Sequence, residues 1–180
     1  MPLSMAYYTV AAKRVQSHRP DVLRSILIAV DVVPEALRAL DWATSQLFKP
    51  GDNCHIAHVI KSHSPQTEVF HGIPGTAYKF PDPAPLNERQ EITMAKQFLK
   101  DRVTTPLDAQ GIPNHIHLFV EEHSAPASAI GELLIKVADE VKADVVVLGT
   151  NDKTTAERWM MGSVADYCSN NMKHPLVLVR

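Results

Sequence analysis

Five short runs of apolar residues, spread along a chain of 180 residues, constrain its fold more than any other feature. The runs at 24–31 and 143–149 are nearly continuous and rich in Ile, Val or Leu, a pattern typical of strands that are buried on both faces of a sheet, and the other three also read as strands. The runs lie at 24–31, 53–60, 115–120, 143–149 and 174–180. The sequence therefore predicts five strands.

The segments between these runs carry apolar residues at helical spacing. The first predicted helix opens at Pro34, a residue that suits the first turn of a helix, and the second is expected to end by Pro106. The four predicted helices lie at about 34–47, 87–105, 130–141 and 163–172. Strands that alternate with helices imply a parallel sheet with helices on both faces. We therefore predict a single α/β domain with an open, parallel, five-stranded sheet.

Composition narrows the class of protein. A hydrophobic content of 45% suits one globular domain, and a net charge of −2 argues against nucleic-acid binding by bulk electrostatics. No apolar run approaches the roughly 18 residues of a membrane-spanning helix, so no membrane partner is expected. Cys54 and Cys168 have no metal or redox spacing, which favours buried free thiols. We expect a cytoplasmic protein.

Two segments do not follow the alternation of strands and helices. The first twenty residues contain no acid and three basic residues, which indicates either a disordered or loosely packed leader or an organelle transit peptide. We expect a leader over 1–22 and the α/β domain over 23–180. Residues 61–85 hold five prolines and two glycines without periodicity, which predicts a long loop that is either functional or mobile.

Ligands of open parallel sheets bind beyond the carboxyl ends of the strands, so the residues that follow each predicted strand are candidates for a site. The first strand ends at Asp31, the second closes with Val59 and Ile60, and the fourth ends at Gly149. Gly162 and Ser163 then open the fourth predicted helix. A glycine and a serine at a helix start can bind an anion through unpaired N–H groups, but they can equally be an ordinary helix start.

The segment from 148 to 169, "VLGTNDKTTAERWMMGSVADYC", resembles the signature of the universal stress protein family. That signature reads Gly, two residues, Gly, nine residues, Gly, then Ser or Thr, and Gly149 and Gly162-Ser163 fill its ends. "ILIAVD", "HVI", "PASAIGELLIKVADEVKADVVVLG" and "HPLVLVR" are similar to further family segments, so that the resemblance spans about 24–180. It implies a Rossmann-like sheet, similar to that of adenine nucleotide alpha hydrolases, with the predicted strands in the order 3-2-1-4-5.

The resemblance also implies a site for an adenine nucleotide, ATP or AMP, with Mg²⁺ as a further possible component. Carried over by position, Asp31 and the backbone of Val59 would hold the adenosine. The phosphates would lie among Gly149, Gly162, Ser163 and Val164. Asp31 has a second interpretation as the capping residue of the following helix.

Asp152 stands where the family signature has its second glycine, and it opposes a nearby triphosphate by about 1 kcal/mol or more, depending on screening. Three interpretations follow. Lys153 or Arg158 could offset the charge, Asp152 could help to hold a divalent cation, or the site could prefer AMP or no charged ligand at all.

Other motifs point to no further activity. His55 and His58, and His115 and His117, lack the spacing of a zinc motif, so no metal site is expected. The chain has no nucleophile elbow and no Walker loop, so no catalytic residue is assigned and slow ATP hydrolysis is the most that we expect. The cluster Trp159-Met160-Met161 indicates ordinary burial against the core about as often as a functional role, either as a cover over the ligand or as a dimer contact.

The sequence therefore predicts a nucleotide-binding sensor or regulatory module of the universal stress type. The alternative is a nucleotide-independent interaction protein whose phosphate site is lost through Asp152. Family members often dimerise through their last strand, and an apolar strand at a sheet edge invites self-association, so a homodimer through 175–180 is expected.

Overall fold

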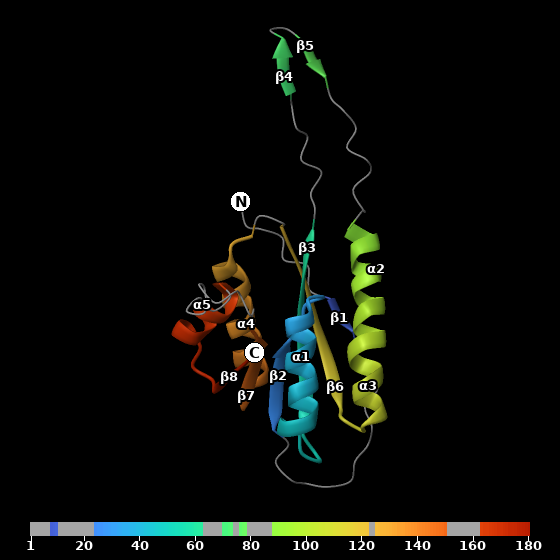
Figure 1. Cartoon of the computed structure of the whole chain (residues 1–180), viewed down its shortest axis with the longest axis vertical. Coiled ribbons are helices and arrows are strands. Elements are labelled where there is room, and N and C mark those ends of the chain that lie inside the picture. Colours follow the sequence, from blue (N-terminus) through green and yellow to red (C-terminus); the bar gives the residue numbers. More distant parts are fainter. Residues whose placement is uncertain are drawn as a thin grey trace.

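The computed structural model of the chain describes residues 8–10, 24–62, 70–73, 76–78, 88–122, 125–150 and 163–180. Within these residues, six strands form one central sheet, and helices pack on both of its faces (Figure 1). Two further short strands form a small sheet of their own.

Five strands of the central sheet correspond to the five apolar runs. They are β2 (Ser25–Ala29), β3 (Asn53–Ser62), β6 (Asn114–Glu122), β7 (Val145–Gly149) and β8 (Leu176–Val179). Every pairing among them is parallel, and they lie in the order β6-β3-β2-β7-β8. This is the predicted order 3-2-1-4-5, so the predicted fold class is confirmed.

The sixth strand, β1 (Tyr8–Val10), lies within the predicted leader. It pairs antiparallel with the outer edge of β6, with Thr9 opposite His117. A three-residue strand is too short to show an alternating pattern, so it could not be predicted from the order of its residues. Its effect is to cover one edge of the parallel sheet.

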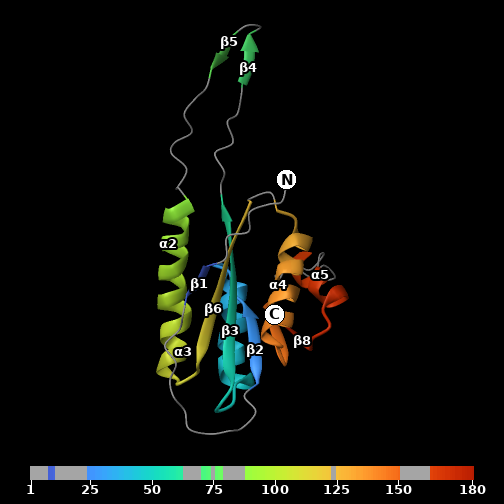
Figure 2. The same cartoon turned by 180° about the vertical axis from the view of Figure 1, so that it is seen from behind.

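Helices cover the two faces of the sheet in separate groups (Figures 1 and 2). On one face lie α1 (Pro34–Trp42) with its extension η1 (Ala43–Leu47), and α2 (Glu88–Leu99), which continues through η2 (Lys100–Thr104) into α3 (Thr105–Ala109). On the other face lie α4 (Ala127–Val141) and α5 (Ser163–Asn171).

Each face has its own hydrophobic core, because successive side chains of a strand point to opposite faces. Ile26 and Ile28 of β2 belong to the core beneath α1 and α2, whereas Leu27 between them belongs to the core beneath α4 and α5. All three side chains are fully buried. The continuous apolar character of β2 is thereby explained, since neither face of the strand meets water.

Two helix boundaries differ from the predicted ones. The second helical segment does not end by Pro106, because this proline occupies the first turn of α3, where its missing N–H needs no partner. The third predicted helix, α4, begins at Ala127 rather than at Ile130.

The predicted loop over 61–85 contains strand structure. β3 runs on to Ser62, and β4 (Phe70–Ile73) pairs antiparallel with β5 (Thr76–Tyr78). The prediction of a loop was therefore wrong for these residues. A stretch rich in proline and glycine is compatible with short strands as well as with a loop, and no strict alternation over 61–85 distinguishes the two cases.

Two expectations about composition can be compared with the structure. Cys54 and Cys168 are buried free thiols, as predicted. Burial raises the pKa of Cys168 to about 11, so this thiol stays protonated near neutral pH. No helix among the described residues is long and apolar enough to cross a membrane.

Candidate functional site

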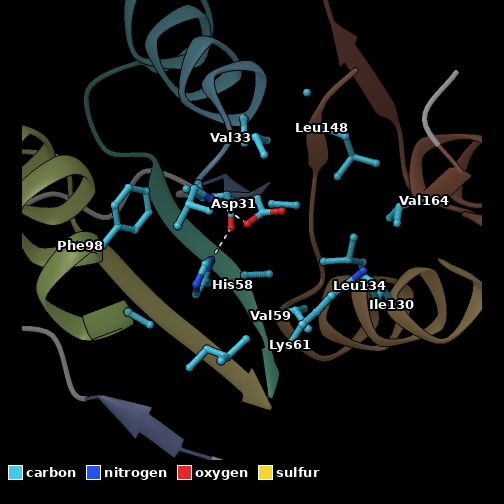
Figure 3. A pocket seen from close by; sticks show the side chains of 18 of the residues that line it. Asp31, Val33, His58, Val59, Lys61, Phe98, Ile130, Leu134, Leu148 and Val164 are labelled. Carbon is cyan, nitrogen blue, oxygen red and sulfur yellow. Dashed lines mark hydrogen bonds between the residues drawn. The ribbon is translucent and has the colours of Figure 1, made fainter. Parts of the chain in front are cut away.

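A cavity of about 750 Å³ lies at the carboxyl ends of β2, β3 and β7 (Figure 3). Side chains of α1, α2, α4 and α5 complete its walls. This position is the one expected for a ligand in a doubly wound sheet, where the strand order reverses between β2 and β7.

The cavity brings together sequence positions that are far apart in the chain. Five of the seven candidate residues line it: Asp31, Val59, Gly149, Ser163 and Val164. The other two, Asp152 and Gly162, lie outside the described residues, as does the cluster at 159–161. The described part of the site is therefore formed by the ends of three strands and the first turn of α5.

Asp31 is exposed at the floor of the cavity, directly after β2. Its Oδ1 accepts a hydrogen bond from the N–H of Val32 at 2.7 Å, and its Oδ2 has no partner among the described residues. The N-cap position of α1 is Val33, without a side-chain cap. The interpretation of Asp31 as a helix cap is therefore wrong, and one carboxylate oxygen is available to a ligand.

Val59 presents its backbone rather than its side chain to the space beyond β2. The carbonyl of Ala57 faces β2, because it accepts the N–H of Val30 at 2.9 Å. Backbone groups repeat their direction every second residue, so the N–H and C=O of Val59 face the same way, past the last paired residue of β2. One donor and one acceptor are thus directed into the cavity.

The first turn of α5 supplies the opposite wall. Ser163 is exposed and Val164 is half-buried, and the first N–H groups of a helix have no partner within the helix. Ala165 and Cys168 are buried against the sheet, and Tyr167 donates to Glu132 of α4 at 3.2 Å. These contacts fix the orientation in which α5 directs its N-terminus toward the cavity.

Three polar residues of the cavity were not among the candidates: His58, Lys61 and Glu91 of α2. His58 is only 4% exposed, and its Nδ1 lies 2.7 Å from the carbonyl oxygen of Val30. Lys61 lies two residues after Val59, so it projects from the same face of β3, on the side of Ile130 and Leu134 in Figure 3. The signal that could have found His58 and Lys61 is their position at the end of the second strand.

The remaining strand histidines form a cluster on the opposite side of β3 from His58. His55 Nδ1 lies 3.1 Å from His117 Nε2, and the ring of His115 stacks on His55 with the ring centroids 5.2 Å apart. Burial, with repulsion from the neighbouring imidazoles, lowers the pKa of His55 to about 4. No group of three metal-ligating side chains is found in the described ranges of the chain.

Comparison with known families and proteins gives consistent matches. A sequence model described as the universal stress protein family matches residues 23–180. The universal stress protein PHOS34 of Arabidopsis thaliana is 26% identical over 170 residues, which cover 87% of this chain. The chain spans 62% of the length of that relative.

Solved structures show the same fold. A universal stress protein from Archaeoglobus fulgidus in complex with dAMP has a TM-score of 0.53 at 21% identity, covering 88% of this chain and 98% of that one. A universal stress protein in complex with cAMP has a TM-score of 0.51 at 23% identity, covering 89% of this chain and 98% of that one.

Proposed function

Because the chain belongs to the universal stress protein family, we propose that it binds an adenine nucleotide, ATP or AMP, and acts as a sensor or regulatory module in a stress response. Two proteins of the same fold are described in complex with dAMP and with cAMP. Both ligands share an adenosine-like group and a phosphate, and the proposed ligand has the same two parts.

The observation that carries this proposal is the convergence of five implied residues on one cavity. They come from the segment after β2, from β3, from β7 and from the start of α5, which are far apart in the sequence. A cavity of this volume suits a ligand of nucleotide size. The convergence supports a nucleotide site more directly than the incomplete glycine signature does.

Each described residue has a chemical role in the proposed complex. The free Oδ2 of Asp31 accepts a hydrogen bond from a ribose hydroxyl or from the adenine amino group. The backbone N–H and C=O of Val59 pair with the edge of the base. The Ser163 hydroxyl and the first N–H groups of α5 donate to phosphate oxygens, and the positive end of the helix favours their charge.

Lys61 adds a cation to the wall of the cavity. Its ammonium group offsets the charges of Asp31 and of a bound phosphate. Asp152 opposes the γ-phosphate of ATP more than the single phosphate of AMP, unless a divalent cation lies between them. The proposal therefore includes a dependence of ATP affinity on Mg²⁺.

Calorimetric titration of the purified protein with ATP, ADP and AMP, each with and without Mg²⁺, tests the proposal. We expect Ser163→Ala to weaken nucleotide binding by about tenfold, because one hydrogen bond to a charged group is lost. Ser169→Ala is the matched control, since Ser169 lies on α5 with its hydroxyl bonded to the carbonyl of Asp166 at 2.8 Å. Equal losses in both variants would contradict a specific role for Ser163.

Asp152→Gly separates the alternatives for the variant signature position. Tighter ATP binding without Mg²⁺ would identify Asp152 as a repulsive charge, whereas loss of the Mg²⁺ effect would identify it as part of a cation site. If only Asp152→Gly bound nucleotide, the protein would be a nucleotide-independent interaction module. If neither protein bound nucleotide, the cavity would have another ligand.

A further inference from the structure

Three histidines gather on the face of the sheet that α4 and α5 cover, outside the cavity. His55 of β3 lies opposite His115 of β6, and His117 lies two residues further along β6, opposite Ala57. Residues two apart on a strand, and residues directly opposite on neighbouring strands, project from the same face. The three imidazoles, which we call the histidine cluster, therefore lie side by side, although 62 positions separate His55 from His117. None of the three lines the cavity.

The histidine cluster lies at the border between the buried and the exposed part of this face. Ala57 and Phe119, the next residues along the same face of the two strands, are each 2% exposed and belong to the core beneath α4 and α5. His55 and His117 are half-buried, whereas His115 is exposed. Packing therefore holds two of the rings in place, and the third can change its side-chain rotamer at little cost.

The two half-buried rings bring their nitrogens together at the spacing of two ligands of one metal ion. Nδ1 of His55 lies 3.1 Å from Nε2 of His117. Two zinc–nitrogen bonds of about 2.0–2.1 Å separate their nitrogens by about 2.9 Å at a right angle and by about 3.3 Å at the tetrahedral angle. The observed distance lies between these values, so an ion can bind both nitrogens with only a small movement of the rings.

Without an ion, the same two nitrogens share a proton. One ring donates its N–H and the other accepts with a lone pair, so the accepting ring is neutral. An ion needs a lone pair on both nitrogens, which requires the shared proton to move to the outer nitrogen of its own ring. Nε2 of His55 and Nδ1 of His117 have no hydrogen-bond partner among the described residues, and neither is a buried unpaired atom. Either outer nitrogen can therefore carry the proton, with water as its acceptor.

His115 supplies a third imidazole. Its ring stacks on the ring of His55, with the centroids 5.2 Å apart and the planes 20° from parallel. In this orientation His115 is not yet a ligand, and no three side chains in the described part of the chain are already arranged around a metal position. Because His115 is exposed, rotation of its side chain can complete a set of three imidazole ligands.

The charge next to the histidine cluster favours a cation. Glu140, an exposed residue of α4, attracts the ring of His117 electrostatically. A carboxylate near a bound dication stabilises it in proportion to both charges. Glu140 therefore adds to the affinity for a divalent ion.

We propose that the histidine cluster binds one zinc ion, with His55 and His117 as the first two ligands, His115 as the third and water in the fourth position. Zinc accepts imidazole ligands and imposes no geometry of its own, which suits a nitrogen–nitrogen distance between two ideal values. The spacing along the chain predicts no metal site, because the ligands come from two strands that only the folded sheet brings together. The ion joins β3 to β6 beside Thr9 of β1, which lies opposite His117.

Calorimetric titration of the tag-free chain with zinc chloride tests the proposal. We expect a saturable site for one ion per chain. His117→Phe retains a ring and removes a ligand, so it should weaken this site by at least about tenfold, since even the loss of a hydrogen-bond partner of a ligand costs about 10–100-fold. His71→Phe is the matched control, because His71 lies on β4, which pairs only with β5 in the described part of the chain. Mg²⁺ in excess should not compete, because it prefers oxygen ligands.

His115→Ala is a second variant, which leaves the packed part of the sheet intact. It should weaken zinc binding by about tenfold, and zinc should raise the melting temperature of the wild-type protein more than that of the variant. Unchanged zinc affinity in a His117→Phe variant that folds, or an equal loss in His71→Phe, would overturn the site. Unchanged affinity in His115→Ala would overturn the assignment of the third ligand.

A spectroscopic measurement needs no variant. With ¹⁵N-labelled histidine in the wild-type protein, zinc should shift the resonances of Nδ1 of His55 and Nε2 of His117, the two nitrogens that face each other. Zinc-induced shifts confined to other histidines would overturn the proposal.

The proposed zinc site does not depend on nucleotide binding. With AMP at saturation, we expect unchanged zinc affinity, because the histidine cluster lies outside the cavity. Zinc binding that appears only with ATP present would assign the ion to the phosphates and overturn the proposal. If no nucleotide bound to the protein, zinc binding to the histidine cluster would still be expected.

Discussion

At the scale of single residues, the imidazole pair formed by His55 and His117 makes the stability of the fold depend on pH. The two rings approach to 3.1 Å between Nδ1 of His55 and Nε2 of His117. Burial, and then repulsion from the neighbouring rings, lowers the pKa of His55 from 6.5 to about 4. Burial and repulsion from His115 also lower the pKa of His117, against the attraction of Glu140 on α4.

These shifts predict that the folded protein loses stability as the pH falls from 6.5 toward 4. In this window the unfolded chain binds more protons than the folded one, so the free energy of unfolding decreases with decreasing pH. The His55 side chain is partly exposed, so solvent screening limits its contribution to the free energy of unfolding to about 1–2 kcal/mol. Urea unfolding at pH 7.5 and at pH 5 measures the loss.

His55→Phe should reduce this loss, because it removes one proton acceptor of the unfolded state. The difference between the two proteins at pH 7.5 gives the packing effect of the substitution alone. An unchanged pH dependence in His55→Phe would show that other groups destabilise the protein in acid.

Residue-level prediction from the sequence reached lining residues of the cavity where a motif and a strand end coincide, and their role in binding stays a prediction. Asp31, Val59 and Ser163 are recognisable because each follows or precedes an apolar run at a position that the family signature implies. His58 and Phe98 are not recognisable in the same way. Their proximity depends on where α2 packs against the sheet. Because α2 follows the proline-rich stretch at 61–85, the sequence does not predict that position.

At the scale of elements, the contact between α4 and α5 sets the position of the proposed phosphate site. A Cβ built on Gly131 of α4 would overlap Cδ1 of Tyr167 and would lie 3.0 Å from Cγ. Tyr167 is one turn after Ser163 on α5. Glycine at 131 therefore permits the close approach that positions the first turn of α5.

Gly131→Ala is expected to lower the free energy of unfolding by about 1–2 kcal/mol, because overpacking outweighs the gain in helix propensity. It should also weaken nucleotide binding, since α5 must move away from the cavity. Chemical denaturation and calorimetric titration measure the two effects.

The same substitution in a Tyr167→Ala background provides the control. With the ring removed, Gly131→Ala should become neutral or stabilising by up to about 1 kcal/mol, because only helix propensity remains. A loss of the same size in both backgrounds would assign the effect to something other than the contact between the two helices.

The predicted helices and strands were correct where the pattern of apolar residues extends over many positions. They were wrong where a single residue or a very short segment determines the structure. All five apolar runs are strands, and the pattern is clearest in β2 and β7, whose central residues are buried on both faces. Pro106 was expected to end a helix, but a proline is tolerated where a helical turn begins anew. The short strands β1, β4 and β5 carry too few residues for a period to be read.

At the scale of the whole molecule, β8 leaves one edge of the sheet unpaired. Among the described strands it pairs with β7 alone. The carbonyls of Pro175 and Val179 accept hydrogen bonds from the N–H groups of Val146 in β7 and of Thr150 just after it, at 2.8 Å in each case. By the two-residue period, the backbone groups of Leu178 face outward from the sheet.

We expect the protein to form a homodimer through this edge, and Leu178→Pro tests it. Proline at 178 removes an outward N–H without removing a bond to β7, so the monomer should fold and the dimer should weaken. Light scattering coupled to size exclusion measures the mass, and circular dichroism checks the fold. Val177→Pro is the contrasting variant, because it removes an inward bond and should destabilise the monomer.

A dimer that persists in Leu178→Pro would exclude pairing through this strand. A monomeric wild-type protein at the concentrations used would exclude the homodimer altogether. We expect Leu178→Pro to leave nucleotide binding unchanged, because Leu178 is not among the residues that line the cavity.

The position of the cavity has a consequence for cooperativity. Its walls include Ala95 of the core beneath α1 and α2, and Leu134 of the core beneath α4 and α5. A molecule bound across the strand ends therefore contacts both hydrophobic cores, which the sheet otherwise separates. Binding should therefore slow amide hydrogen exchange in α2 and in α4 together. The helices on one face of the sheet would then open locally only together with those on the other face.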